Sequence, residues 1–208
     1  MHVTLVLFAE STPLDAIGPY EALIRVPELE VEFAGMQVGS LSTSRGPLRL
    51  HADRALAELE RTDILLVPGG PGTRALERDE PLLAELRRLA ATARVTASVC
   101  TGALLLGAAG LLRGRRATTH WKFVERLAEF GATPVADERV VVDGEVWTAA
   151  GVSAGIDLAL RLIAELYDAE LAQCVQLGME YDPQPPFDAG SVRGADPAIV
   201  ARVRAATR

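Results

Sequence analysis

The chain has 208 residues, with 21 basic and 28 acidic side chains and a formal net charge of −7 at pH 7. A nucleic-acid-binding protein would carry a basic face, so this balance argues against nucleic acid as a partner. Hydrophobic residues make up 49% of the chain, which is ordinary for a globular protein, and the length fits one α/β domain over residues 1–208.

The chain begins with an apolar run over residues 3–8 that predicts a first buried strand. No basic segment precedes this run and Glu10 follows it closely, so it does not have the pattern of a signal peptide. No apolar run reaches the roughly 18 residues that span a bilayer, so we expect no membrane segment. The two cysteines, Cys100 and Cys174, form no spacing motif, which favours a reducing compartment. We therefore expect a cytoplasmic protein.

Short apolar runs alternate with amphipathic segments along the chain, which predicts a mostly parallel sheet with helices on both faces. The predicted strands are residues 3–8, 31–34, 64–67, 95–99, 140–142 and 146–148. The predicted helices are residues 15–25, 80–93, 103–109, 120–130, 154–167 and 171–181, with a short helix from about residue 196.

Two hairpins, a helix cap and an extended segment complete this prediction. Residues 41–50 favour a short hairpin around Arg45-Gly46-Pro47, and Asp143-Gly144 is a strong two-residue hairpin signal. Thr119 is expected to cap the helix over residues 120–130, and the proline-rich residues 182–191 are expected to be extended surface chain.

The segment Ala97-Ser98-Val99-Cys100-Thr101-Gly102 predicts a strand that turns sharply into a helix, with Cys100 on the turn. A thiol at such an elbow suits a nucleophile, because a helix N-terminus favours the thiolate. We expect Cys100 to be an accessible thiol of low pKa on a strained backbone, oxidised more readily than Cys174, which fits the core face of a helix. The alternative is a buried cysteine that only packs.

Two further strand ends carry residues suited to chemistry: Asp15 after the first strand, and Gly69 and Gly70 after the strand over residues 64–67. Ligands in open α/β sheets gather at such carboxyl ends. A buried carboxyl group can move protons, and a glycine N–H can donate to developing negative charge. The alternatives are that Asp15 caps its helix and that the glycines form only a tight loop. That loop lacks the ending of a P-loop, so it supports phosphate binding only weakly.

Other polar residues near these strand ends have open roles. Thr101 either belongs to the reactive set or caps the helix that follows it. His120 is a candidate for a supporting position behind the reacting groups, with a structural role as the alternative. His2 and His51 have no ligand-type side chains clustered around them in the sequence, so no metal site is predicted.

Taken together, these segments resemble the ThiJ/PfpI superfamily over nearly the whole chain. The motifs that carry the resemblance are Leu14-Asp15-Ala16-Ile17-Gly18-Pro19, Val67-Pro68-Gly69-Gly70-Pro71-Gly72, Ala97-Ser98-Val99-Cys100-Thr101-Gly102, Arg116-Ala117-Thr118-Thr119-His120-Trp121 and Glu180-Tyr181-Asp182-Pro183-Gln184-Pro185-Pro186-Phe187. The resemblance implies a flavodoxin-like, doubly wound α/β fold related to class I glutamine amidotransferases. It also implies a homodimer with the active site near the interface.

Within the superfamily, the details are most similar to the isocyanide hydratase branch. That branch has Asp after the first strand, as at Asp15, and Thr after the nucleophile, as at Thr101. PfpI-type peptidases carry His directly after the nucleophilic Cys, and Thr101 cannot supply an imidazole. The glyoxalase-like members generally have Glu at the position of Asp15.

The resemblance implies that Cys100 adds to an isocyanide carbon to give a thioimidate, which water converts to an N-formamide. Asp15 would move the proton, and the amides of Thr101, Gly69 and Gly70 would stabilise charge near the nucleophile. The Thr101 hydroxyl could orient the attacking water. The partner would be a small-molecule substrate, and no metal or organic cofactor is expected. A glyoxalase or deglycase activity, and a redox or stress sensor without enzymatic activity, remain as alternatives.

Overall fold

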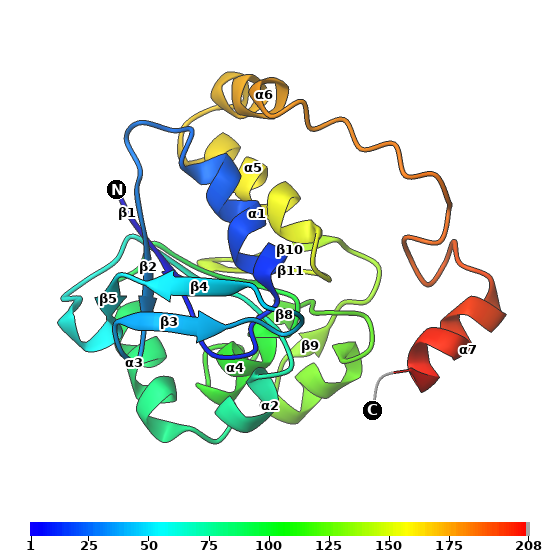
Figure 1. Ribbon diagram of the computed structural model, residues 1–208, viewed down its shortest axis with the longest axis horizontal. Coiled ribbons are helices and arrows are strands. Elements are labelled where there is room, and N and C mark those ends of the chain that lie inside the picture. The colour runs from blue at the N-terminus through cyan, green and yellow to red at the C-terminus, as the bar shows by residue number, and fades with distance from the viewer. Residues whose placement is uncertain (207–208) are drawn as a thin grey trace.

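The computed structural model describes residues 1–206, and its centre is a seven-stranded sheet in the order β10-β11-β7-β6-β1-β2-β5 (Figure 1). The strands are β1 (His2–Val6), β2 (Glu30–Gly35), β5 (Arg54–Ala55), β6 (Ile64–Val67), β7 (Val95–Val99), β10 (Val140–Asp143) and β11 (Val146–Ala149). All neighbours pair in parallel except β10, which runs antiparallel to β11 at one edge. The predicted mostly parallel sheet is confirmed.

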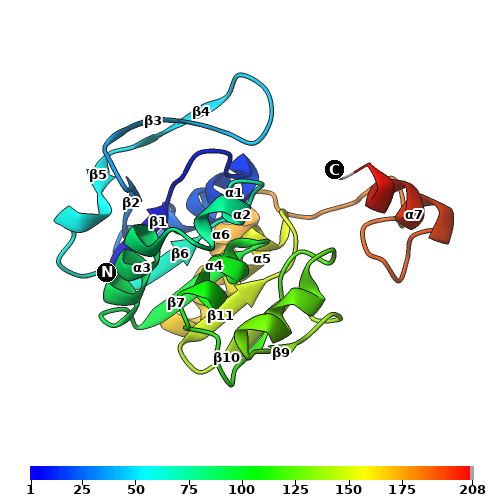
Figure 2. The same ribbon diagram turned by 90° about the horizontal axis from the view of Figure 1, so that it is seen from below.

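Helices cover both faces of this sheet, as the sequence predicts (Figures 1 and 2). The helices are α1 (Pro13–Leu23), α2 (Thr73–Leu76), α3 (Glu80–Ala90), α4 (Gly102–Ala108), α5 (Ala154–Leu166), α6 (Ala169–Gly178) and α7 (Pro197–Ala205). Helices α3 and α4 share one buried apolar cluster with the sheet, and α1, α5 and α6 share a second cluster. The sheet therefore has a core on each side, which is the doubly wound, flavodoxin-like arrangement.

Helix α3 illustrates how the sequence pattern produces this packing. Its apolar residues recur at helical spacing, and four of them are buried: Leu82, Leu83, Leu86 and Leu89. Burying a leucine side chain stabilises the fold by roughly 1.5–3 kcal/mol. The helix starts after Asp79, whose side chain accepts a hydrogen bond from the Leu82 amide at 3.0 Å.

Both predicted hairpins are present. Strands β3 (Gly39–Ser42) and β4 (Arg49–Ala52) pair in antiparallel fashion, and β10 pairs with β11 across Asp143-Gly144. Gly144 has a φ of 59°, the left-handed conformation that such a two-residue turn requires. A small parallel pair, β8 (Arg116–Ala117) with β9 (Thr133–Pro134), was not predicted.

The predicted helix over residues 120–130 is wrong in its first part. Residues 121–123 form turns, and a 3₁₀ segment, η2, covers only Val124–Phe130. Thr119 does not cap it, because its hydroxyl donates instead to the carbonyl oxygen of Cys100 at 2.6 Å. This tertiary hydrogen bond holds the chain against the elbow, so the helical pattern begins later than the sequence indicates.

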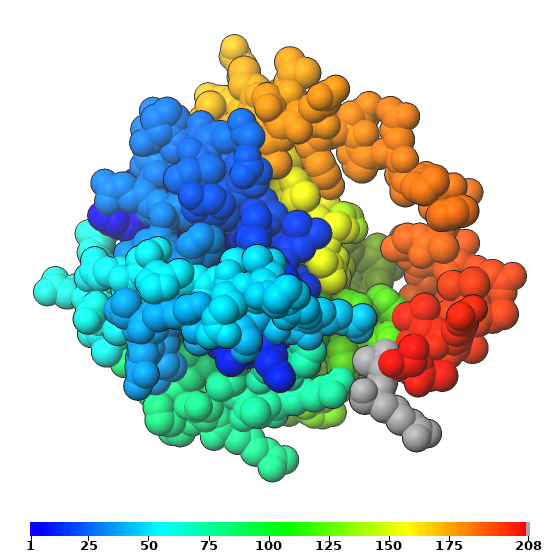
Figure 3. Space-filling model, viewed as in Figure 1, coloured from blue at the N-terminus to red at the C-terminus, as the bar shows by residue number. Residues whose placement is uncertain are grey.

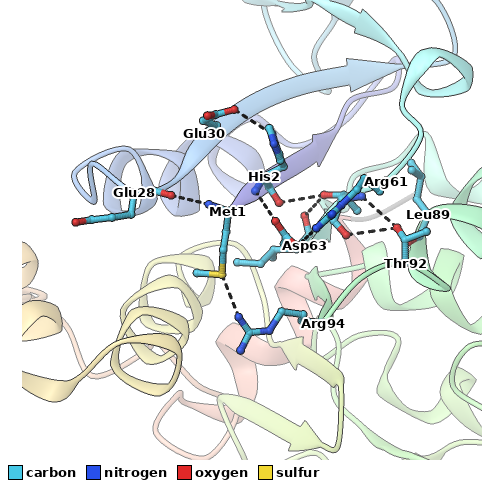
Figure 4. Close-up of polar contacts among 11 residues, drawn as sticks. Met1, His2, Glu28, Glu30, Arg61, Asp63, Leu89, Thr92 and Arg94 are labelled. Carbon is cyan, nitrogen blue, oxygen red and sulfur yellow. Dashed lines mark hydrogen bonds and ion pairs between the residues drawn. The ribbon is translucent and has the colours of Figure 1, made fainter.

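At the amino end of the sheet, a network of polar contacts ties β1 to the segment before β6 (Figure 4). The Asp63 carboxylate accepts from the His2 amide and from the Arg61 guanidinium, each at 2.8 Å. The His2 amide and Arg61 lower the pKa of Asp63, although its burial acts in the opposite direction. This end of the sheet therefore holds a carboxylate with both oxygens hydrogen-bonded.

The chain after α6 runs away from the body of the protein as an extended arm that ends in α7 (Figures 1 and 2). Residues 182–191 are exposed along their whole length, as predicted for this proline-rich segment. The contacts between α7 and the region after β8 include a hydrogen bond from Lys122 to the Val203 carbonyl at 2.5 Å, and the Arg204 guanidinium lies 5.2 Å from the centre of the Trp121 ring. Within residues 1–206, no helix is long and apolar enough to cross a membrane.

Candidate active site

Cys100 lies on a sharp turn between β7 and α4, as the sequence predicts. Its φ of 57° is in the left-handed region, an uncommon conformation for a residue with a side chain. Its amide donates to the carbonyl oxygens of Ala149 and Ala150, at 3.1 and 2.9 Å. Gly102 allows the turn to pack, because a Cβ there would lie 2.1 Å from the Val67 carbonyl oxygen. The strained backbone expected at this cysteine is therefore present.

Asp15 lies in the first turn of α1, after the connection over residues 7–12 that follows β1, and is fully buried. Its Oδ2 atom accepts a hydrogen bond from the Gly69 amide at 3.0 Å. Thr12 occupies the N-cap position of α1, so the capping role considered for Asp15 is wrong. Among the described residues, the second oxygen, Oδ1, has no hydrogen-bond partner. Asp15 thus carries a buried oxygen that can take a proton.

The glycine turn after β6 connects Asp15 to the elbow. The Gly70 amide donates to the Thr101 Oγ1 atom at 2.8 Å, while the Gly69 amide is bonded to Asp15. A Cβ at Gly69 would lie 2.4 Å from the Thr101 nitrogen, so only glycine fits there. We expected these two amides to face developing charge on a substrate. The structure corrects this, because both amides are already engaged by side chains of the site.

The expected low pKa of Cys100 is contradicted by its surroundings. Cys100 is only 5% exposed, and burial together with the neighbouring charge of Asp15 raises the pKa of its thiol to about 12. The amides of Val152 and Thr101 favour the thiolate but do not offset these two effects. Helix α4 is seven residues long, and its N-terminus does not compensate for the lost hydration. The proton therefore rests on the Cys100 sulfur while Asp15 is ionised.

The pKa of Asp15 is also raised. Burial raises the pKa of its carboxyl group to about 7, although the Gly69 amide and the Cys100 thiol both favour the ionised form. Both protonation states of Asp15 are therefore populated near neutral pH. A carboxyl group of this kind beside a thiol can accept the thiol proton and pass it on, which is the property expected of a general acid–base group.

Val152 contributes to the site and was not predicted from the sequence. The Val152 amide is directed at the Cys100 sulfur from the turn that follows β11, and Val152 itself has a φ of 37°. Such a φ in a β-branched residue costs on the order of 1–3 kcal/mol and points to a constrained site. The small residues 149–155 between a buried strand and a helix were the available signal, since β11 lies next to β7 in the sheet.

A cavity of about 210 Å³ opens above Cys100. Its walls include Thr101 and Gly70 from the predicted set and Val152 from the turn after β11, whereas Asp15 lies below the cavity wall. His120 also lines it, and burial, then the charge of Lys122, lower the pKa of this imidazole. The structure thus brings together Asp15, Cys100, Thr101, the glycine turn and His120.

Cys174, which we expected in the core face of α6, is exposed instead. Its side chain lies outside the residues that line the cavity. In residues 1–206, no group of three or more His, Cys, Asp or Glu side chains is arranged to hold a metal ion.

Comparison with known proteins agrees with the observed fold. The DJ-1/PfpI family model matches residues 1–165. The isonitrile hydratase of Pseudomonas putida is 45% identical over 208 residues, which cover 99% of this chain and 90% of that protein. A ThiJ/PfpI family protein from Pseudomonas syringae superimposes with a TM-score of 0.94 at 35% identity, covering 98% of this chain and 85% of that one. A glutathione-independent glyoxalase of Caenorhabditis elegans is 28% identical, covering 77% of this chain and 86% of its own length. The chain belongs to the DJ-1/PfpI family.

Proposed function

We propose that this protein is an enzyme that adds water to an isocyanide to give an N-formamide, with Cys100 as the nucleophile. The observation that carries the proposal is the buried Asp15 carboxyl group beside the Cys100 thiol, with a pKa of about 7 and a free Oδ1 atom. The 45% identity to an isonitrile hydratase supports the choice of substrate, since an isonitrile and an isocyanide are the same functional group.

The first step adds the thiol across the terminal carbon of the isocyanide. As the Cys100 sulfur bonds to that carbon, the thiol proton passes to the Asp15 carboxylate, which then delivers it to the same carbon. The product is a covalent thioimidate, in which the former isocyanide carbon carries one hydrogen. A pKa of about 7 for Asp15 suits both halves of this transfer.

The second step hydrolyses the thioimidate. Asp15 takes a proton from a water molecule as its oxygen adds to the carbon, and this proton passes to the substrate nitrogen. The resulting adduct collapses to the formamide, the C–S bond breaks, and the remaining hydroxyl proton returns to the Cys100 sulfur. The Thr101 hydroxyl, held by the Gly70 amide at 2.8 Å, lies on the cavity wall where it can orient this water.

The direct test follows the consumption of para-nitrophenyl isocyanide and traps the covalent adduct by mass spectrometry. We expect a mass increase on the peptide that contains Cys100 and release of the corresponding formamide. An inactive wild-type protein across a panel of isocyanides would remove the substrate assignment.

A glyoxalase or deglycase activity is the second candidate, and the similarity to a glyoxalase of the same family supports testing it. Methylglyoxal assayed beside the isocyanide panel separates the two activities. A sensor that relies on thiol oxidation has less support, because burial and a raised pKa both slow oxidation of Cys100. The homodimer stays a prediction, which light scattering at micromolar concentration tests.

A further inference from the structure

The mouth of the cavity above Cys100 is cationic, although the chain as a whole carries a net charge of −7. Four of the lining residues are basic and none is acidic: Arg45, Arg74, Lys122 and Arg126. A neutral isocyanide does not need such a lining. The basic side chains therefore suggest that the bound molecule carries negative charge, which the hydration reaction itself does not require.

These cations differ in how far they are neutralised by the protein. Arg126 is paired with Glu77, through contacts of 3.0 and 2.7 Å, and also with Glu129. Arg45 and Arg74 are exposed, and their side chains make no hydrogen bond or ion pair with any residue in the range 1–206. The Arg74 guanidinium lies 6.0 Å from the centre of the Phe123 ring, which leaves its N–H groups available. Two guanidinium groups at the mouth thus lack a counterion within the described chain.

A second cavity, of about 250 Å³, adjoins the first and shares three of its lining residues, Arg74, Lys122 and Phe123. Its fourth lining residue is Arg204 from α7. In Figure 3, the tip of the β3–β4 hairpin, which contains Arg45, points toward α7 across a hollow in the surface. The first cavity thus reaches Cys100, and the second cavity is lined mostly by basic side chains.

We propose that the substrate carries an anionic group, of the carboxylate or sulfonate class, which binds Arg74 and Arg45 at the mouth while its electrophilic end reaches Cys100. Planar guanidinium groups bind such oxyanions through paired, charge-assisted hydrogen bonds. A mouth of one charge also concentrates oppositely charged molecules, and salt weakens this effect. The inference deepens the proposed function, which supplies only the identity of the electrophilic group.

The first experiment measures alkylation of Cys100 and does not depend on isocyanide chemistry. Iodoacetate and iodoacetamide have similar size and differ in charge, and the exposed Cys174 serves as an internal reference in the same molecule. We expect the rate ratio of iodoacetate to iodoacetamide at Cys100 to exceed that at Cys174 by about tenfold at low salt. The excess should shrink as salt is added.

Substitutions test which residues produce the excess in the rate ratio at Cys100. Arg74→Gln and Arg45→Gln should each lower the excess several-fold, and the double variant should abolish it. Arg78→Gln removes the same charge from an exposed residue outside both cavities, so it should leave the ratio at Cys100 unchanged. Equal ratios at the two cysteines of the wild-type protein would overturn the proposal, and so would an excess that survives in the double variant.

The second experiment compares 4-isocyanobenzoate with its neutral methyl ester as substrates. We expect kcat/KM to favour the anion by roughly 10- to 100-fold, as one or two charge-assisted hydrogen bonds imply, and Arg74→Gln to lower that preference. An enzyme that hydrates the ester as well as the acid refutes the anion site and leaves the hydratase function standing. If iodoacetate alkylates Cys100 preferentially but the protein hydrates neither compound, the anion site stands and the hydratase function is refuted.

Discussion

Two buried aspartates at opposite ends of the central sheet have opposite electrostatic properties. At the amino end, Asp63 is 8% exposed and both of its oxygens accept hydrogen bonds, and its pKa is lowered. At the carboxyl end, Asp15 is 0% exposed, only one of its oxygens is bonded, and its pKa is raised to about 7. Burial is the larger influence at Asp15 and raises its pKa, whereas the hydrogen bond from the His2 amide is the larger influence at Asp63 and lowers its pKa.

The opposite pKa shifts distinguish a carboxylate that stabilises the fold, Asp63, from one that is suited to proton transfer, Asp15. Asp63 joins strands and has a cationic neighbour, Arg61, so its ionised form contributes to stability. Asp15 has no cation among its perturbing groups, and a thiol lies beside it. Folding therefore places Asp15 in an environment that costs free energy when it is ionised, which is common where a group must exchange protons.

The largest effect that we expect comes from Cys100→Ala, which should abolish isocyanide turnover. Cys100 supplies the only thiol among the residues that line the cavity, and the neighbouring Thr101 hydroxyl is already bonded to Gly70. The assay is the consumption of para-nitrophenyl isocyanide. The exposed Cys174→Ala is the matched control and should retain wild-type rates. Wild-type turnover in Cys100→Ala would refute the nucleophilic mechanism.

Asp15→Asn should lower kcat by roughly 100- to 10,000-fold, because an amide cannot pass the thiol proton to the substrate. Asp15→Glu should also impair turnover, by roughly 100-fold, since one added methylene displaces the carboxyl group by about 1 Å. Asp63→Asn changes the same atoms at the other end of the sheet and should leave kcat unchanged. If Asp15→Asn and Asp63→Asn lowered kcat equally, the effect of Asp15 on turnover would come only from its contribution to the stability of the fold.

The pKa of Asp15 also predicts a pH dependence of stability. A pKa that rises from 3.8 in the unfolded chain to about 7 in the folded protein favours folding below pH 3.8, and this advantage is lost as the pH rises to 7. The full change corresponds to roughly 4 kcal/mol in the free energy of unfolding. The stability of Asp15→Asn relative to wild type should therefore increase between pH 4 and pH 7 in urea unfolding experiments. A relative stability that is constant over this range would contradict the raised pKa.

Asp63→Asn should show the opposite sign and the smallest effect. The lowered pKa of Asp63 stabilises the folded protein above the unfolded pKa of 3.8, and this contribution disappears as the pH falls through the folded pKa. Loss of charge-assisted hydrogen bonds to the His2 amide and Arg61 should cost about 1–3 kcal/mol at pH 7. The cost should diminish as the pH falls below 3.8, and an undiminished cost in acid would show that packing, not charge, is responsible.

Local patterns in the sequence determined most of the architecture. Apolar runs and leucine spacing identified the buried strands and α3, and Asp143-Gly144 identified its hairpin, because these features depend on neighbours within a few residues. The elbow at Cys100 was also predictable, since a small-residue strand that ends in Cys-Thr-Gly has few ways to turn. The resemblance to a known superfamily grouped Asp15, Thr101 and the glycine turn with this cysteine.

Only the tertiary structure decided the electrostatics of the site and the shape of its mouth. The pKa of Cys100 depends on its burial and on a carboxyl group 85 positions away in the chain, so the helix-based expectation of a low pKa was wrong. The start of η2 and the Val152 amide depend on contacts between distant strands. Arg45 lies between β3 and β4 and Arg74 lies in α2, and their charges add at one cavity because folding brings these two segments together. Long-range contacts of this kind leave no periodic signal in the sequence.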